Sequence, residues 1–254
     1  TAWQTYITAL DNFQTQGVIV FANGNFNTDS DASFMAALPF WYNGGTDELG
    51  NSVEDLSDAW LSVLYADFTG ADMVGITESE FTLKGNPCGV TKEFCVTVDD
   101  YQINHPSWYN ESTGANNFSM GTGGSSWGAP MISGGVALVK QAFPNHTPEQ
   151  IVDRILASAN NSWFTPAGNT TFTTHGASIT HGYHATWGHG LPDFLAAMSP
   201  ITSNMNPASV PTGGNLNNAQ PEQNNGNNNS LHSPQKYAVS HSTLSVPGLL
   251  GDAL

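Results

Sequence analysis

Two adjacent serines stand immediately before an apolar helix in this chain. The segment Gly124-Ser125-Ser126-Trp127-Gly128-Ala129-Pro130 runs into an apolar, glycine-containing stretch over 131–139, which predicts a turn of small residues followed by a helix. A serine in that place is suited to act as a nucleophile. The turn exposes the hydroxyl, and the free N–H groups of the first helical turn attract developing negative charge. Close packing of a helix on a sheet also favours small residues, so the segment alone leaves both interpretations open.

The same segment resembles the Gly-Thr-Ser-x-Ala-x-Pro signature of the subtilisin-like serine proteases, or subtilases. Gly124, Ser126 and Pro130 match the glycine, the nucleophile and the proline of that signature. Ser125 and Gly128 stand where the family has threonine and alanine, and both departures are to small residues that keep the turn feasible. The resemblance implies that Ser126 forms the acyl-enzyme.

A second polar candidate follows an apolar run. Residues 17–22 predict a buried strand, which ends in Asn23-Gly24-Asn25. Asparagine and glycine are also common in plain turns, so the pattern by itself is weak. It resembles the Ala-Gly-Asn that ends the corresponding subtilase strand, which implies that the Asn25 side chain donates a hydrogen bond to the oxyanion. Loss of such a donor lowers turnover roughly 10²–10³-fold, a magnitude that itself comes from a subtilase.

Further segments extend the resemblance over about residues 1–202. Trp187 to Asp193 is similar to the Gly-x-Gly-x-x-Asp element that closes the subtilase domain, and it implies a structural role only. Residues 37–39, 59–63, 86–89 and 94–95 look like the subtilase passengers of Gram-negative autotransporters. The resemblance therefore implies a bacterial enzyme that is secreted or displayed at the cell surface, with polypeptide substrates.

The histidine and aspartate that activate a subtilase serine are not recognisable here. In the family both precede the oxyanion asparagine, whereas Asp29-Ser30-Asp31 follows Asn25 and lacks the required glycine. His175-Gly176 and His181-Gly182 follow Ser126. We therefore interpret the chain as the C-terminal half of a longer protease, whose missing N-terminal half supplies both groups. As given, the chain is expected to be inactive.

Composition limits the classes of partner. The 254 residues carry a net charge of −16, with 21 acidic against 5 basic residues. Nucleic acid and anionic membranes are disfavoured as partners, because they require clustered lysine and arginine. No transmembrane run is present, and we expect no membrane contact by this segment. No cofactor is required by the chemistry and no metal site is predicted, while structural calcium is left open.

Cys88 and Cys95 are the only cysteines. Their short separation favours a disulfide, with two buried thiols as the alternative. A metal site is less favoured because the pair has no second half. A disulfide would indicate an oxidising compartment.

Alternating strands and helices predict an α/β fold, a subtilisin-like three-layer sandwich with a mostly parallel sheet flanked by helices. Strands are expected at 17–22, 60–66 and 94–98, and a helix with a capping box opens at Thr147. Residues 163–186 predict a hairpin or loops. The predicted domain is 1–202, and 203–254, rich in asparagine, glycine and proline, predict a disordered linker or tail.

Three other interpretations remain. The segment 124–128 also matches the G-x-S-x-G elbow of α/β-hydrolase esterases, but 116–123 do not read as the apolar strand that the elbow needs. His175, His181, His184 and His189 suggest zinc, although glycines and hydroxyl residues between them favour ordinary loops. Finally, the chain would be a degenerate, non-catalytic binding module if the activating histidine and aspartate were absent altogether.

Overall fold

The computed structural model describes residues 1–199 except 71–72, 74, 102, 104, 120–122 and 177. The predicted linker at 203–254 lies outside these described residues. Along the chain the elements are α1 (Ala2–Gln14), β1 (Ile19–Ala22), α2 (Leu38–Trp41), β2 (Trp60–Phe68), η1 (Glu78–Glu80), β3 (Phe81–Leu83), η2 (Gly89–Phe94), β4 (Cys95–Asp99), β5 (His105–Asn110), β6 (Ala115–Ser119), α3 (Ser125–Ala142), α4 (Pro148–Ser158), β7 (Gly168–Phe172), β8 (Ile179–Tyr183) and α5 (Phe194–Ala197).

Strand β2 is the centre of the main sheet. It pairs in parallel with β1 and with β4, and its last residues pair antiparallel with β3. Eight of its nine residues are buried, as expected for a strand that is covered on both faces. Leu61 and Val63 face a core shared with α3 and α4, whereas Trp60 and Leu64 belong to cores on the other face. The predicted mixed α/β sandwich with a mostly parallel sheet is confirmed.

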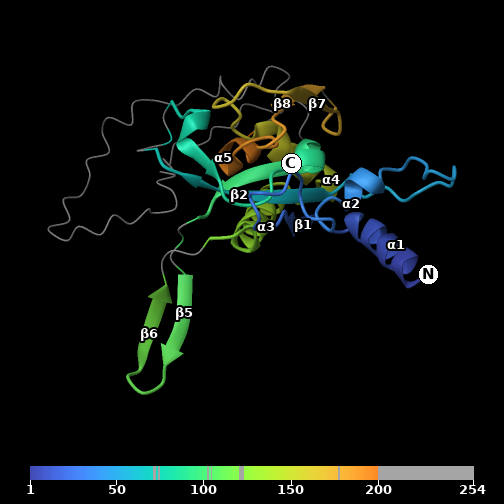
Figure 1. Ribbon diagram of the computed structural model, residues 1–254. Helices are drawn as coiled ribbons and strands as arrows, with labels where there is room; N and C mark the ends of the chain where they lie inside the picture. Colours follow the sequence, from blue (N-terminus) through green and yellow to red (C-terminus); the bar gives the residue numbers. More distant parts are fainter. Residues whose placement is uncertain are drawn as a thin grey trace.

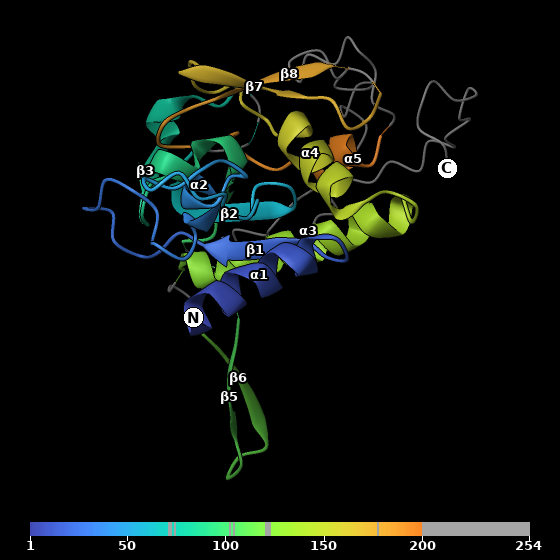
Figure 2. The same cartoon turned by 90° about the vertical axis from the view of Figure 1, so that its right-hand side faces the viewer.

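Local signals explain several of these elements. Thr147 caps α4 by accepting a hydrogen bond from the Gln150 N–H, and Gln150 completes the capping box through its side chain. This is the cap predicted from the sequence. The expected hairpin within 163–186 is the β7–β8 ribbon, which lies at the top of the molecule in Figures 1 and 2.

One ribbon was not predicted. Strands β5 and β6 form an antiparallel hairpin that stands apart from the body in both views (Figures 1 and 2). Strand β6 covers the first part of 116–123, a segment that the sequence did not indicate as an apolar strand. Among the described residues the two arms pair only with each other and not with the main sheet.

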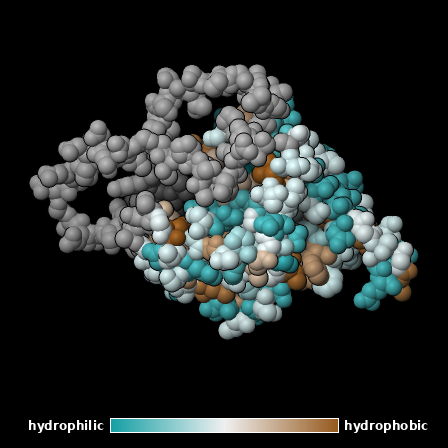
Figure 3. Space-filling view, turned by 90° about the horizontal axis from the view of Figure 1, so that it is seen from above, coloured by the Kyte–Doolittle hydropathy of each residue, from teal (hydrophilic) through white to brown (hydrophobic). Residues whose placement is uncertain are grey.

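The surface is polar although few residues are charged. On the face seen in Figure 3, teal and white atoms prevail over scattered brown ones. Large apolar side chains do reach the surface, among them Trp3, Tyr6 and Phe13 of α1. No helix in the described part of the chain is long and apolar enough to cross a membrane.

Candidate active site

The parallel sheet brings Asn25 to the start of helix α3. Asn25 follows the carboxyl end of β1, where the loop leaves the sheet, and α3 begins at Ser125 with Gly124 as its N-cap. The Ser125 N–H donates to Asn25 Oδ1 at 3.0 Å, and the Ser125 hydroxyl donates to the same oxygen at 2.9 Å. Two segments a hundred positions apart are thereby joined at one point.

Asn25 and Ser126, the two candidate site residues, both lie next to Gly124. A Cβ atom built on Gly124 would be 3.4 Å from both Oδ1 and Nδ2 of Asn25 and 3.5 Å from Ser126 Oγ. The separation between the Asn25 amide and the Ser126 hydroxyl therefore cannot exceed the sum of two such distances. Ser126 and Asn25 are both exposed. The absence of a side chain at position 124 leaves the space between them open.

The hydrogen bonds of Ser125 orient the Asn25 amide. A backbone N–H can only donate, so the atom of Asn25 that faces it must be the carbonyl oxygen. The Nδ2 group consequently points away from Ser125 and has no hydrogen bond within the described residues. Ser125, only 1% exposed, also accepts from the Gly24 N–H at 3.1 Å. The sequence indicated Ser125 only as a small substitute for threonine. Its hydrogen bonds to Asn25 Oδ1 were not predicted.

Ser126 occupies the first turn of α3, where N–H groups have no acceptor within the helix. Pro130, four residues later, has no N–H to return to the Ser126 carbonyl. The exposed Oγ, an outward Nδ2 and the N–H groups of a helix start form the set of groups that can bind an oxyanion next to a nucleophile.

The four histidines considered from the sequence make their hydrogen bonds with groups other than this serine. In the part of the chain described, no histidine side chain is hydrogen-bonded to Ser126. His181 and His189 are paired with each other, Nδ1 to Nδ1, at 2.8 Å, and their Nε2 atoms face the carbonyl oxygens of Ala159 and Glu93. Burial lowers the pKa of both rings, that of His189 to about 3.

The zinc interpretation of the four histidines finds no support in their positions. His175 Nε2 faces the Gln150 carbonyl oxygen, and His184 accepts from the Thr186 N–H. Among the described residues no group of three or more histidine, cysteine, aspartate or glutamate side chains is placed to hold a metal ion.

A buried carboxyl group lies beneath the first turn of α3. Asp100, directly after β4, is 1% exposed, and neither of its carboxyl oxygens accepts a hydrogen bond of good geometry. Burial, reinforced by the charge of Asp99, raises the pKa of Asp100 to about 8. A Cβ atom built on Gly128 would be 2.6 Å from Val98 Cγ2 and 2.9 Å from Asp100 Oδ2. This close contact explains why glycine stands at position 128.

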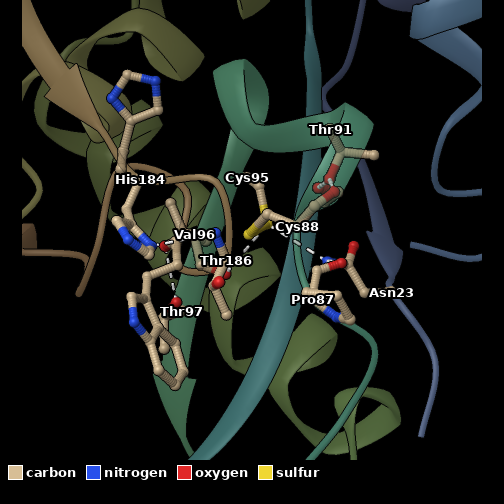
Figure 4. Close-up of a disulfide and its surroundings, with 12 residues drawn as sticks. Asn23, Pro87, Cys88, Thr91, Cys95, Val96, Thr97, His184 and Thr186 are labelled. Carbon is tan, nitrogen blue, oxygen red and sulfur yellow. Dashed lines mark hydrogen bonds between the residues drawn. A yellow bond between two sulfur atoms is a disulfide. The ribbon is translucent and has the colours of Figure 1, made fainter. Parts of the chain in front are cut away.

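The disulfide predicted from the spacing is present. Cys88 and Cys95 are joined, both are fully buried, and their Cα atoms are 5.9 Å apart (Figure 4). Asn23, two residues before Asn25, lies against it: Asn23 Nδ2 is 3.4 Å from Cys95 Sγ and donates to the Pro87 carbonyl at 3.4 Å. The cysteines therefore adjoin the base of the loop that carries Asn25.

A pocket of the described residues lies elsewhere. It has a volume of about 540 Å³ and is lined by residues of α2, η2, α4 and β7. None of Asn25, Ser125 and Ser126 lines it. The candidate site is instead an open junction between a strand end and a helix start.

The model of the subtilase family of peptidases matches residues 1–177. No curated protein sequence matches the chain. Similar solved structures include fervidolysin from Fervidobacterium pennivorans, described as a keratinolytic enzyme related to subtilisin, with 20% identity and a TM-score of 0.48 over 78% of this chain and 25% of that one. The self-cleaved protease domain of PatA shows 16% identity and a TM-score of 0.44, covering 75% and 52%.

MycP1 from Mycobacterium smegmatis shows 22% identity and a TM-score of 0.38, covering 74% of this chain and 43% of its own. The chain thus spans between a quarter and about half of the length of these structures. Because the family model matches well over half of the sequence, this chain belongs to the subtilase family of serine proteases.

Proposed function

We propose that this chain supplies the nucleophile and the oxyanion-binding groups of a subtilisin-type serine endopeptidase. The supporting observation is that the side chains of Ser126 and Asn25, both exposed, lie close to one point beside Gly124. In this role Ser126 Oγ attacks the scissile carbonyl carbon and a C–O bond forms. The resulting oxyanion accepts hydrogen bonds from Asn25 Nδ2 and from an N–H at the start of α3.

The proton of Ser126 requires a base that the described residues do not place beside it. We infer that a histidine, oriented by an aspartate, comes from a polypeptide segment outside the chain. That histidine takes the Oγ proton and then delivers it to the departing amine, leaving an acyl-enzyme that water hydrolyses. The sheet supports this inference, because β1 pairs with β2 alone among the described strands and its other edge is not paired with any of them.

The cellular setting is also a proposal. We infer a secreted or surface-displayed bacterial enzyme of the kind carried as autotransporter passengers. The Cys88–Cys95 disulfide supports export, since disulfides persist in oxidising compartments. A net charge of −16 is consistent with polypeptide substrates and argues against nucleic acid.

The competing elbow interpretation has less support. Strand β6 precedes Ser126, but it pairs only with β5 among the described strands and does not belong to the main sheet. An α/β-hydrolase elbow places its serine directly after a strand of that sheet. A degenerate binding module stays the second candidate, because no described histidine contacts Ser126.

The proposal is tested by peptide hydrolysis with a longer polypeptide, which is expressed from the coding sequence of this chain together with the sequence upstream of it. We expect Ser126→Ala to lower kcat by several orders of magnitude and Asn25→Ala to lower kcat roughly 10²–10³-fold. Ser133→Ala is the matched control, since Ser133 lies in the same helix and its hydroxyl bonds only to the Ala129 carbonyl. Hydrolysis that survives Ser126→Ala would refute the assignment, and no hydrolysis at all would favour the binding module.

A further inference from the structure

The loop that carries Asn25 is wrapped around one buried side chain. Asn86 is 3% exposed and lies in the segment between β3 and η2. The Phe26 N–H donates to Asn86 Oδ1 at 2.8 Å, and the Asn86 N–H donates to the Gly24 carbonyl at 3.1 Å. The residues on both sides of Asn25 are therefore held by the same asparagine.

The amide nitrogen of Asn86 secures the far end of the same loop. Nδ2 donates to Asp29 Oδ2 at 2.8 Å and to the Asp31 carbonyl at 2.9 Å. Both N–H groups of the side chain and one lone pair of its oxygen are thus used, three of the four hydrogen bonds that a primary amide can make. A carboxylate of the same shape would keep the contact with Phe26 and lose both donors.

The segment around Asn86 is itself anchored. Pro87 and Cys88 follow it directly, and the disulfide ties Cys88 to the start of β4. Asn23 donates to the Pro87 carbonyl beside the disulfide, as Figure 4 shows. Gly24 adopts φ +119°, and a Cβ atom there would be 2.5 Å from Asn86 Oδ1. The loop and Asn86 therefore fit against each other with no space for a side chain at position 24.

We infer that Asn86 is a positioning residue that sets the place of the Asn25 amide, while Ser125 sets its direction. This inference rests on the proposed function of Asn25. A donor contributes to catalysis only when it is held where the oxyanion forms, and a displacement well below the length of a hydrogen bond weakens it steeply. Asn86 touches no reacting atom, so its effect must pass through Asn25.

The experiment is a double-mutant cycle in the longer polypeptide. We expect Asn86→Asp, assayed above neutral pH, to lower kcat at least tenfold and to change KM less than twofold. The loss in kcat should not exceed that caused by removing the Asn25 side chain, which is roughly 10²–10³-fold. In an Asn25→Ala background the same substitution should change kcat less than twofold, because the group that it positions is gone. An equal loss in both backgrounds would show a purely structural role and overturn the inference.

Two further variants separate positioning from misfolding. Asn161→Asp is the matched control. Asn161 also donates Nδ2 to a backbone carbonyl, that of Gly182, but this hydrogen bond involves no residue of the Asn25 loop. This substitution should leave kcat unchanged. Asn86→Asp combined with Asp29→Asn should recover part of the lost kcat, because the amide introduced at position 29 can donate to the new carboxylate at position 86. Failure of this exchange to recover any activity, with both proteins folded by circular dichroism, would contradict the inference.

A spectroscopic readout covers the case in which the proposed function fails. If Ser126→Ala shows that no serine-dependent hydrolysis exists, the nitrogen-15 and proton resonances of the Asn25 side-chain amide still test whether Asn86 positions that amide. In the 254-residue chain, assigned with Asn25→Asp, these resonances should shift or broaden in Asn86→Asp and stay in place in Asn161→Asp. Unchanged Asn25 resonances in Asn86→Asp would overturn the positioning role independently of any activity.

Discussion

At the scale of single residues, the chemistry depends on which atom of Asn25 faces the site. The Ser125 N–H and hydroxyl both donate to Oδ1, so Nδ2 is turned outward. Serine at position 125 keeps the hydroxyl that the threonine of the family signature also has. The departure from the signature therefore preserves a hydrogen-bond donor while removing a methyl group.

Removing that hydroxyl tests the orientation. We expect Ser125→Ala to lower kcat of the longer polypeptide about fivefold with little change in KM, because one of two bonds to Asn25 Oδ1 is lost and a hydrogen bond contributes about 1 kcal/mol. Steady-state peptide hydrolysis measures this. Ser125→Thr keeps the hydroxyl and should stay close to wild type. Equal kcat in all three proteins would mean that the hydroxyl does not orient the amide.

Asp100 makes stability depend on pH. Its folded pKa of about 8 lies above the unfolded value of 3.8, so the folded state binds the proton more tightly. Folding is then favoured by this residue at acidic pH, and the benefit is lost as pH rises from about 4 to about 8. Above about pH 8, we expect Asp100→Asn to raise the unfolding temperature clearly, and near pH 4 hardly at all. A pH series of thermal melts measures it, and a pH-independent difference would contradict the burial argument.

At the scale of elements, the start and packing of α3 fix the site. Gly135 is buried, and a side chain there would overlap the ring of Phe194 from α5. Its neighbour Gly134 is exposed, with nothing within 4 Å of a Cβ atom. Of these two consecutive glycines, packing therefore requires glycine only at position 135, whereas position 134 has space for a side chain.

These two positions form a matched pair. We expect Gly135→Ala to destabilise the protein by about 1–3 kcal/mol, because the added methyl group forces Phe194 to move. Gly134→Ala should instead stabilise it by about 0.5–1 kcal/mol, since alanine loses less backbone entropy in a helix. Urea unfolding of the two variants gives both values. The same sign for both substitutions would show that α3 does not pack on α5 as described.

The elements were predicted where the sequence carries local signals. The predicted strands at 17–22 and 60–66 correspond to β1 and β2, and the capping box at Thr147 opens α4 as expected. The β5–β6 hairpin was missed because neither arm shows the alternation of apolar and polar residues that indicates a half-buried strand. Strand β3 was missed because three residues are too few to carry any period.

The site was predicted only in part for a related reason. Ser126 and Asn25 belong to short motifs that can be read locally. Asn86 contacts Phe26 across 60 positions, and an asparagine before a proline is typical of an ordinary turn. Hydrogen bonds between distant segments leave no periodic trace in a sequence, so the residues that support the site become visible only in three dimensions.

At the scale of the whole molecule, one disulfide ties the segment that follows Asn86 to the first residue of β4 in the main sheet. The disulfide closes a loop of seven positions between fully buried cysteines. Replacing both by alanine, Cys88→Ala with Cys95→Ala, should lower the free energy of unfolding by about 2.5 kcal/mol, because the unfolded chain regains the entropy of the open loop. Urea unfolding with and without reductant measures it. Wild type should respond to reductant and the double variant should not; a wild type that ignores reductant would contradict the prediction.

The central claim is that Ser126 is a nucleophile whose base lies outside this chain. Labelling with a fluorophosphonate, followed by peptide mass spectrometry, tests it most directly, because only an activated serine reacts at a useful rate. We predict that the longer polypeptide is labelled at Ser126 and that the 254-residue chain alone is not. Rapid labelling of Ser126 in the isolated chain would show that a base exists within it, and labelling of any other serine in the longer polypeptide would contradict the assignment.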